Sequence, residues 1–255
     1  MSYNPPFKVN NEVLTLVSNI TELVRKATVS AELNKNPTLR RENRIKTIHG
    51  SLAIEQNTLS LEQVTAVING KAVLAPPKDI EEVKNAFEIY ELLDTLNPYS
   101  IDDLLKSHGV LMRGLIDGAG AFRTVSAGVV ESKTGAVIHM GTLPQYVPQL
   151  TEDLLLWLKE SDAHELIKAC VFHYEFEVIH PFLDGNGRLG RLWHTLILSK
   201  WNPIFAYLPI ESMIHKNQRA YYNCINSCNL KADSTEFLIF MLELIKQALE
   251  EITCS

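Results

Sequence analysis

The stretch His180-Pro-Phe-Leu-Asp-Gly-Asn-Gly-Arg-Leu-Gly-Arg191 lies between two segments with helical periodicity. Pro181 disfavours α geometry at the residue before it, so the first helix should end near His180. Gly185 and Gly187 permit a tight turn in which backbone N–H groups converge without obstruction by Cβ atoms. Because a new helix begins directly after the turn, its unpaired N–H groups and positive dipole end should add to this cradle. The stretch therefore predicts an anion-binding turn between two helices.

Four charged or titratable side chains lie in the same stretch. Arg188 and Arg191 are three residues apart, so both should project from one helix face and reach toward the same anion. Two arginines indicate more than one phosphate. His180 and Asp184, at the mouth of the turn, supply a base and a hard oxygen ligand for Mg²⁺. We interpret the stretch as a phosphate site.

Amphipathic helical spacing dominates the rest of the chain. Ser60 followed by Gln63 predicts a capping box, Asp79 followed by Glu82 opens another helix, and Ser100 caps a third. The predicted helices cover approximately residues 13–24, 39–52, 60–67, 79–96, 100–115, 147–158, 166–179, 189–200, 216–228 and 236–252.

One segment departs from the helical pattern. Between residues 122 and 142, β-branched residues flank the turn-like sequence Ser132-Lys-Thr-Gly135, which predicts a short β-hairpin. The expected fold class is therefore mainly α with one hairpin. We expect an N-terminal helical region, residues 1–75, that packs with a core of residues 76–255 as one compact unit.

The composition is that of a folded globular chain, with 255 residues of which 46% are apolar and 21% charged. The net charge of −6 disfavours nucleic acid as a partner. No stretch approaches the roughly 20 apolar residues of a membrane span, and the N-terminus has no apolar run of signal-peptide length. We expect a cytoplasmic protein without membrane contact. The sequence leaves open whether the chain forms a homodimer.

At every fixed position the stretch from His180 to Arg191 matches HxFx(D/E)GNGRxxR, the signature of the Fic family, which the chain resembles over about residues 80–250. The resemblance implies a Fic-type helical bundle with the hairpin as its flap. It also implies a nucleotidyltransferase that uses ATP and Mg²⁺ to AMPylate a target protein. A Ser, Thr or Tyr hydroxyl of the target, which could be the chain itself, would attack the α-phosphate, and pyrophosphate would leave.

The resemblance gives each residue of the stretch a role. His180 would be the catalytic base that takes the proton from the attacking hydroxyl, and Asp184 would hold Mg²⁺ between the α- and β-phosphates. Backbone N–H groups and the Asn186 side chain would bind the α- and β-phosphates, and the arginines would bind the β- and γ-phosphates. The nucleotide-binding residues would be Gly185, Asn186, Gly187, Arg188 and Arg191.

The hairpin has an implied role as well. An exposed hairpin edge offers unpaired N–H and C=O groups to which a strand of a target can add. In Fic relatives the flap docks targets in this way. Val137, Ile138 and His139 are the candidates for the target-facing strand.

The segment from Ser51 to Gln56 resembles the inhibitory motif (S/T)xxxE(G/N) of one Fic class. Ser51 and Glu55 fit the motif, whereas Gln56 stands where Gly or Asn is expected. A carboxylate delivered to Arg191 would satisfy its charge and occupy the space that the γ-phosphate needs. We therefore expect Glu55 to pair with Arg191 and to restrain AMP transfer.

Two alternatives to autoinhibited AMPylation stay open. In such relatives the inhibitory Glu can also assist removal of AMP from a modified target, so the chain could act as a deAMPylase. It could also be a non-catalytic regulatory module that senses ATP, with Glu55 blocking chemistry permanently. AMP transfer by a variant that lacks the Glu55 carboxylate would distinguish an autoinhibited enzyme from a non-catalytic module.

Overall fold

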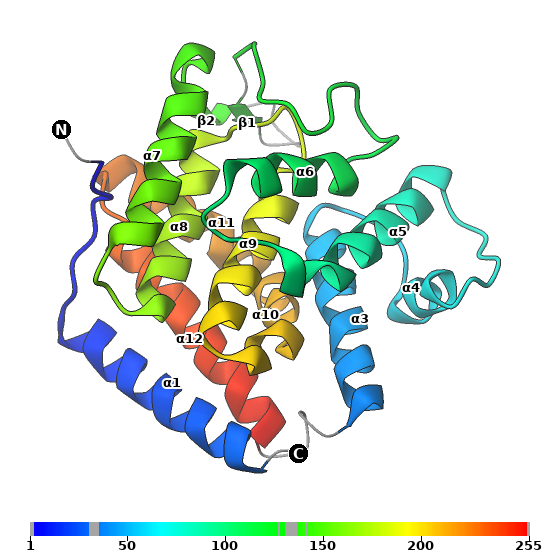
Figure 1. The fold of residues 1–255 in the computed structure, drawn as a ribbon, viewed down its shortest axis with the longest axis horizontal. Helices are drawn as coiled ribbons and strands as arrows, with labels where there is room; N and C mark the ends of the chain where they lie inside the picture. Colours follow the sequence, from blue (N-terminus) through cyan, green and yellow to red (C-terminus); the bar gives the residue numbers. More distant parts are fainter. Residues whose placement is uncertain (1–2, 31–35, 127, 131–136, 141, 254–255) are drawn as a thin grey trace.

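The computed structural model describes residues 3–30, 36–126, 128–130, 137–140 and 142–253. Within them the chain is mainly helical, as predicted, and the helices share one apolar core (Figure 1). The α-helices are α1 (Asn11–Ser30), α3 (Pro37–Ile54), α4 (Leu61–Ile68), α5 (Pro77–Glu91), α6 (Ile101–Leu111), α7 (Val147–Glu160), α8 (Glu165–Ile179), α9 (Asn186–Trp201), α10 (Ile210–Lys216), α11 (Gln218–Lys231) and α12 (Thr235–Thr253). The short 3-10 helices are η1 (Leu93–Thr95), η2 (Pro144–Tyr146) and η3 (Pro203–Tyr207).

The centre of the fold is the pair α8 and α9, which pack against each other and are buried over most of their length (Figure 1). Apolar residues occur on all sides of α8, which is typical of a helix that is surrounded by other helices. The surrounding elements include α7 and α12 on α8, and α6 and η3 on α9. The turn between α8 and α9 is therefore held at one end of a rigid pair.

The N-terminal helices take different positions around this pair. α1 lies along α12, whereas α3 packs against α10 and α5 (Figure 1). At Gly50 the backbones of α3 and α10 approach closely, because an added Cβ would lie 2.8 Å from the Ser212 backbone nitrogen. This close approach fixes the position of the C-terminal turn of α3, where Ser51 lies.

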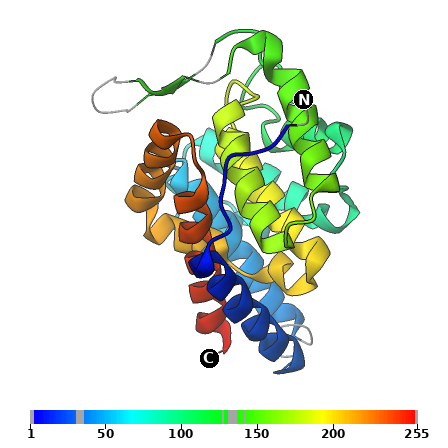
Figure 2. The same cartoon turned by 90° about the vertical axis from the view of Figure 1, so that its left-hand side faces the viewer.

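Two short strands pair in the predicted hairpin segment. β1 (Gly128–Val130) and β2 (Val137–Met140) are antiparallel, with Val129 opposite His139. They extend away from the helices in Figure 2. Residues 131–136, which include the predicted turn, lie outside the described residues.

Of the three helix starts that we predicted from capping residues, two are confirmed and one is wrong. Ser60 and Ser100 cap their helices as predicted, and Ser60 forms the full capping box. The start that we assigned to Asp79 is wrong, because α5 begins earlier, at Pro77, where proline already has helical φ. The Asp79 carboxylate instead accepts a hydrogen bond from the Thr58 backbone N–H at 3.0 Å.

The helix predicted over residues 216–228 is α11, which begins two residues later than expected, and the sequence did not predict α10 before it. Asn217 ends α10, because its backbone N–H donates to Met213 O and Ile214 O, and its side chain also donates to Met213 O. The Asn217 carbonyl then accepts from Tyr221 N in the first turn of α11. No helix among the described residues is long and apolar enough to cross a membrane.

Candidate active site

The turn between α8 and α9 has the conformation that its sequence predicts. His180 follows α8 in the left-handed region with φ 53°, and Gly185 precedes α9 with φ 84°. The Asn186 side chain closes the turn, since its Oδ1 accepts from Phe182 N at 2.9 Å and its Nδ2 donates to Phe182 O at 2.8 Å. We expected this side chain on phosphate, but in the structure it holds the backbone of the turn.

The inner side of the turn rests on a histidine that the sequence did not single out. His108 stacks on Phe182 with ring centroids 3.7 Å apart. Its Nδ1 accepts from Gly120 N, so the proton lies on Nε2, which donates to Asp184 O at 2.9 Å. Burial lowers the pKa of His108 and favours this neutral ring. His108 thus positions the turn from a distant helix, α6.

Arg123 connects the turn to the hairpin segment. Its backbone N–H donates to Pro181 O, and its Nε donates to His180 O at 2.6 Å. The same guanidinium donates to Val125 O and Thr142 O, which lie on either side of the strands. One buried side chain therefore links the backbone at His180 to both ends of the hairpin segment.

The two arginines of the stretch do not converge on one point in this structure. Arg188 Nη1 donates to Glu82 Oε1 on α5 at 2.9 Å, and its Nη2 donates to Asp184 Oδ1 at 3.0 Å. Arg188 and Glu82 are both buried, and each neutralises the charge of the other. Either charge would be costly to bury without its partner. The partnership with Glu82 was not predicted.

Arg191 reaches α3 instead and is almost fully buried. Its Nε donates to Ser51 Oγ at 3.1 Å, and its Nη2 donates to Ser51 O at 3.0 Å. The same Nη2 donates to Glu55 Oε1 at 2.7 Å. The structure thus places both residues of the resembled inhibitory motif on Arg191.

The Glu55 carboxylate lies over the glycine turn. A Cβ added at Gly187 would overlap Glu55 Oε1 and lie 2.9 Å from Arg191 Nη1. The remaining cavity, about 140 Å³, is bordered by Glu55, His180, Asp184 and the turn. Small-molecule sites usually have about 300 Å³ or more. Glu55 therefore occupies part of the space that an anion bound at the turn would take.

Gln56, the residue that departs from the motif, ends α3 with a positive φ of 66°. Gly and Asn adopt this left-handed conformation at the lowest cost, which explains the Gly or Asn expected there. The chain accepts glutamine at this position, and its N–H still donates to Ala53 O at 3.1 Å.

Asp184 fits the ligand chemistry of Mg²⁺. Its side chain is about half exposed and borders the small cavity. Its Oδ1 accepts from Gly185 N and Arg188 Nη2. Mg²⁺ commonly takes one or two carboxylates and completes its shell with water and substrate phosphates. A single carboxylate beside a phosphate-sized cavity meets this pattern, although the described residues contain no cluster of three or more His, Cys, Asp or Glu ligands.

The predicted docking residues Val137, Ile138 and His139 form most of β2. Their side chains lie outside the described part of the structure. For these three residues the structure describes the backbone, which belongs to the strand that pairs with β1.

The conformation of Gly185 leads to a stability prediction. A Cβ at Gly185 would lie 2.5 Å from Met112 Sδ, and φ is also positive. Gly70 has a similar positive φ of 71° with open space around it, so Gly70→Ala isolates the backbone cost. We expect Gly70→Ala to lower the free energy of unfolding by about 1 kcal/mol and Gly185→Ala by about 2–4 kcal/mol, measured by urea denaturation. Equal losses would contradict a contact with Met112.

A buried carboxyl group, Glu177, also borders the small cavity. Burial raises its pKa to about 7; Arg191 opposes this rise and Glu55 adds to it. Its Oε1 is buried without a hydrogen-bond donor among the described residues. Glu177 thus lies close enough to Arg191 for their charges to interact.

The raised pKa gives a pH prediction. The folded protein holds the Glu177 proton more tightly than the unfolded chain, so this contribution to stability is complete below about pH 4.5 and is lost as pH rises through 7. Between pH 5 and 8, the unfolding free energy of the wild type should fall by on the order of 2–3 kcal/mol relative to Glu177→Gln. Parallel urea curves at each pH measure the difference, and a constant difference would contradict the raised pKa.

Comparisons with known proteins bear on the family and the fold of the chain. Residues 98–198 match the Fic/DOC family. The crystal structure of a Fic family protein from Desulfovibrio desulfuricans is 48% identical, with a TM-score of 0.95, and the match covers 99% of this chain and 77% of that one. Fic-1 from Caenorhabditis elegans has the same fold, with a TM-score of 0.77 at 22% identity over 95% of this chain and 72% of that chain.

A curated relative, protein adenylyltransferase fic-1 of Caenorhabditis elegans, is 29% identical over 90% of this chain and 48% of its own length. The chain spans about half the length of the curated relatives it matches. The likeness to the Desulfovibrio protein extends over nearly the whole chain, and the residues that match the Fic/DOC family include the turn from His180 to Arg191. The chain therefore belongs to the Fic family.

Proposed function

We propose that the chain is a protein adenylyltransferase that transfers AMP from ATP to a Ser, Thr or Tyr hydroxyl of a target protein. The observation that carries the proposal is the turn between α8 and α9. It presents His180, the first N–H groups of α9 and Arg191 around one cavity. The names of the curated relatives, which are protein adenylyltransferases, support the same activity.

His180 acts as the base in this proposal. It accepts the proton of the target hydroxyl as the hydroxyl oxygen bonds to the α-phosphorus. The bond between the α-phosphorus and the bridging oxygen breaks, and pyrophosphate leaves with its electrons. The backbone N–H groups of Asn186 and Gly187 lie in the first turn of α9, where a helix has no carbonyl for them, and they donate to phosphate oxygens.

Arg191 and Asp184 complete the phosphate site. Arg191 meets the γ-phosphate once Glu55 has left, and Ser51 keeps its guanidinium oriented. Arg188 contributes to the β- and γ-phosphate site while Glu82 holds one side of its guanidinium. Bound Mg²⁺, held by Asp184, would neutralise phosphate charge.

The proposal gives two further segments a role. The N-terminal region, residues 1–75, acts as a regulatory unit on the core of residues 76–255, because α3 delivers Glu55 to Arg191. The edge of β2 around Val137, Ile138 and His139 docks the target strand, and Arg123 links this flap to His180. The target could be another copy of the chain.

ATP labelled on either the α- or the γ-phosphate tests the reaction type. With Mg²⁺ and the Glu55→Gly variant, α-label should appear in protein and γ-label should not. Incorporation of γ-label alone would mean phosphate transfer and would overturn AMP transfer. ATP binding without incorporation of either label would favour the non-catalytic ATP-sensing module.

The reverse reaction is the second candidate, since Glu55 borders the cavity beside His180 and could orient water. Target that the Glu55→Gly variant has AMPylated is the substrate for this test. Release of labelled AMP by the wild type but not by Glu55→Gln would show that the chain acts as a deAMPylase.

A further inference from the structure

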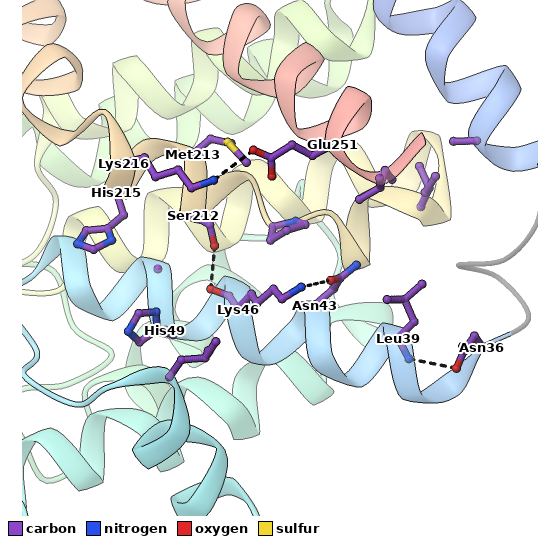
Figure 3. A pocket seen from close by; sticks show the side chains of 16 residues that line it. Asn36, Leu39, Asn43, Lys46, His49, Ser212, Met213, His215, Lys216 and Glu251 are labelled. Carbon is purple, nitrogen blue, oxygen red and sulfur yellow. Dashed lines mark hydrogen bonds and ion pairs between the residues drawn. The ribbon is translucent and has the colours of Figure 1, made fainter. Parts of the chain in front are cut away.

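A second cavity of about 930 Å³ lies between α3 and α10, bordered by the ends of α1 and α12 (Figure 3). It shares no lining residue with the small cavity at the turn. Its volume is in the range typical of small-molecule sites. The cavity is therefore separate from the proposed active site and large enough for an organic ligand.

One wall of the cavity presents hydrogen-bond donors from α3 (Figure 3). Lys46 Nζ donates to Asn43 Oδ1 at 3.4 Å, and no carboxylate among the described residues lies within ion-pair distance of Lys46. Asn43 is 3% exposed, and its Nδ2 is buried without an acceptor in the described part of the chain. Because this nitrogen is buried, the exposed Lys46 ammonium is the donor on this wall that a ligand can reach.

The opposite wall belongs to α10 and α12. Lys216 lies 3.2 Å from Glu251, and Ser212 Oγ donates to Lys46 O, which ties α10 to α3 (Figure 3). Apolar side chains, including Leu61 and Met213, also line the cavity. The cavity thus combines an ammonium group that lacks an acidic partner with apolar walls.

We propose that this cavity binds an organic anion with an apolar body, whose carboxylate or phosphate group is held by Lys46. The anionic group pairs with the exposed Lys46 ammonium at the wall of the cavity. The apolar body contacts Leu61 and Met213, where burial is favourable.

Binding at this site would hold α3 in place. The effect of such binding on AMP transfer rests on the proposed function. Asn43 and Lys46 lie on the same helix as Ser51, and Gly50 fixes α3 against α10 at the edge of the cavity. A ligand that fits the present arrangement stabilises it by linkage and holds Glu55 on Arg191. The ligand would therefore be an inhibitor of AMP transfer.

Binding can be tested without any activity, so its failure is distinct from failure of the proposed function. The probe is anilinonaphthalene sulfonate, an organic anion, and its uncharged counterpart is phenylnaphthylamine; the fluorescence of both rises on binding. We expect the anionic probe to bind the wild type saturably and Lys46→Gln about fivefold more weakly. Lys159→Gln, which removes an exposed lysine of α7, should bind as the wild type does.

The uncharged probe should bind the wild type and Lys46→Gln equally, because it does not use the ammonium group. Leu61→Trp, which fills the apolar part of the cavity, should abolish binding of the anionic probe. Displacement of the probe by decanoate or by decyl phosphate identifies the preferred head group. Unchanged binding in Lys46→Gln, retained binding in Leu61→Trp, or displacement by neither anion would overturn the proposal.

Discussion

Replacing Glu55 by glutamine is expected to raise AMP incorporation by roughly ten- to hundredfold. The carboxylate holds Arg191 at 2.7 Å and lies over Gly187, so it repels a phosphate at the turn and occupies its space. A charge-assisted hydrogen bond contributes about 1.5–3 kcal/mol, which corresponds to this range. Glu55→Gly should give an increase at least as large, because it also removes the side-chain volume. Initial rates of incorporation of α-labelled ATP measure both variants.

The matched control is Glu62→Gln, which removes an exposed carboxylate from α4 without touching Arg191. Its rate should equal that of the wild type. Ser51→Ala, in contrast, removes a hydrogen bond that orients Arg191 and leaves the ion pair with Glu55, so it should not raise the rate. If Glu55→Gln is no faster than the wild type, Glu55 is not the brake.

Replacing His180 in the Glu55→Gly background is expected to lower AMP incorporation by at least about 10²- to 10⁴-fold, the usual contribution of a general base. His180 lies at the end of α8 beside the cavity, with its carbonyl held by Arg123. The change should act on the chemical step and leave ATP binding intact. Labelling rates, together with ATP affinity from calorimetry, measure the two effects.

His180→Asn provides the control for backbone conformation. His180 has φ 53°, which asparagine adopts readily and alanine does not. Both His180→Ala and His180→Asn should be inactive if the imidazole is the base, and His180→Asn should retain the melting temperature of its parent. Activity in His180→Asn would assign His180 a purely conformational role.

Much of the site could be predicted from the sequence, because its determinants are close together in the chain. Proline at 181 and glycine at 185 impose local backbone geometry, and the structure shows α8 ending and α9 beginning around them. The capping serines at 60 and 100 act on N–H groups within three residues. Local steric rules decide such features, so neighbouring residues suffice to predict them.

Predictions of helix starts and ends failed where more than one nearby residue could begin or end a helix. Asp79 has the spacing of a helix cap, but Pro77 starts α5 and frees Asp79 to bind Thr58. The sequence predicted α11 but not α10 before it, which Asn217 ends with its own side chain. Periodicity records which faces are apolar, and it does not record where a polar side chain will satisfy the backbone.

The sequence by itself determined the turn from His180 to Arg191 and the presence of a carboxylate, Glu55, that resembles a brake. The tertiary structure alone decided the partners of each charge. Arg188 is held by Glu82, and Glu55 meets Arg191 from 136 residues away in the chain. Which charges meet depends on how α3, α5 and α9 pack, because a buried arginine takes whichever carboxylate the fold brings within reach.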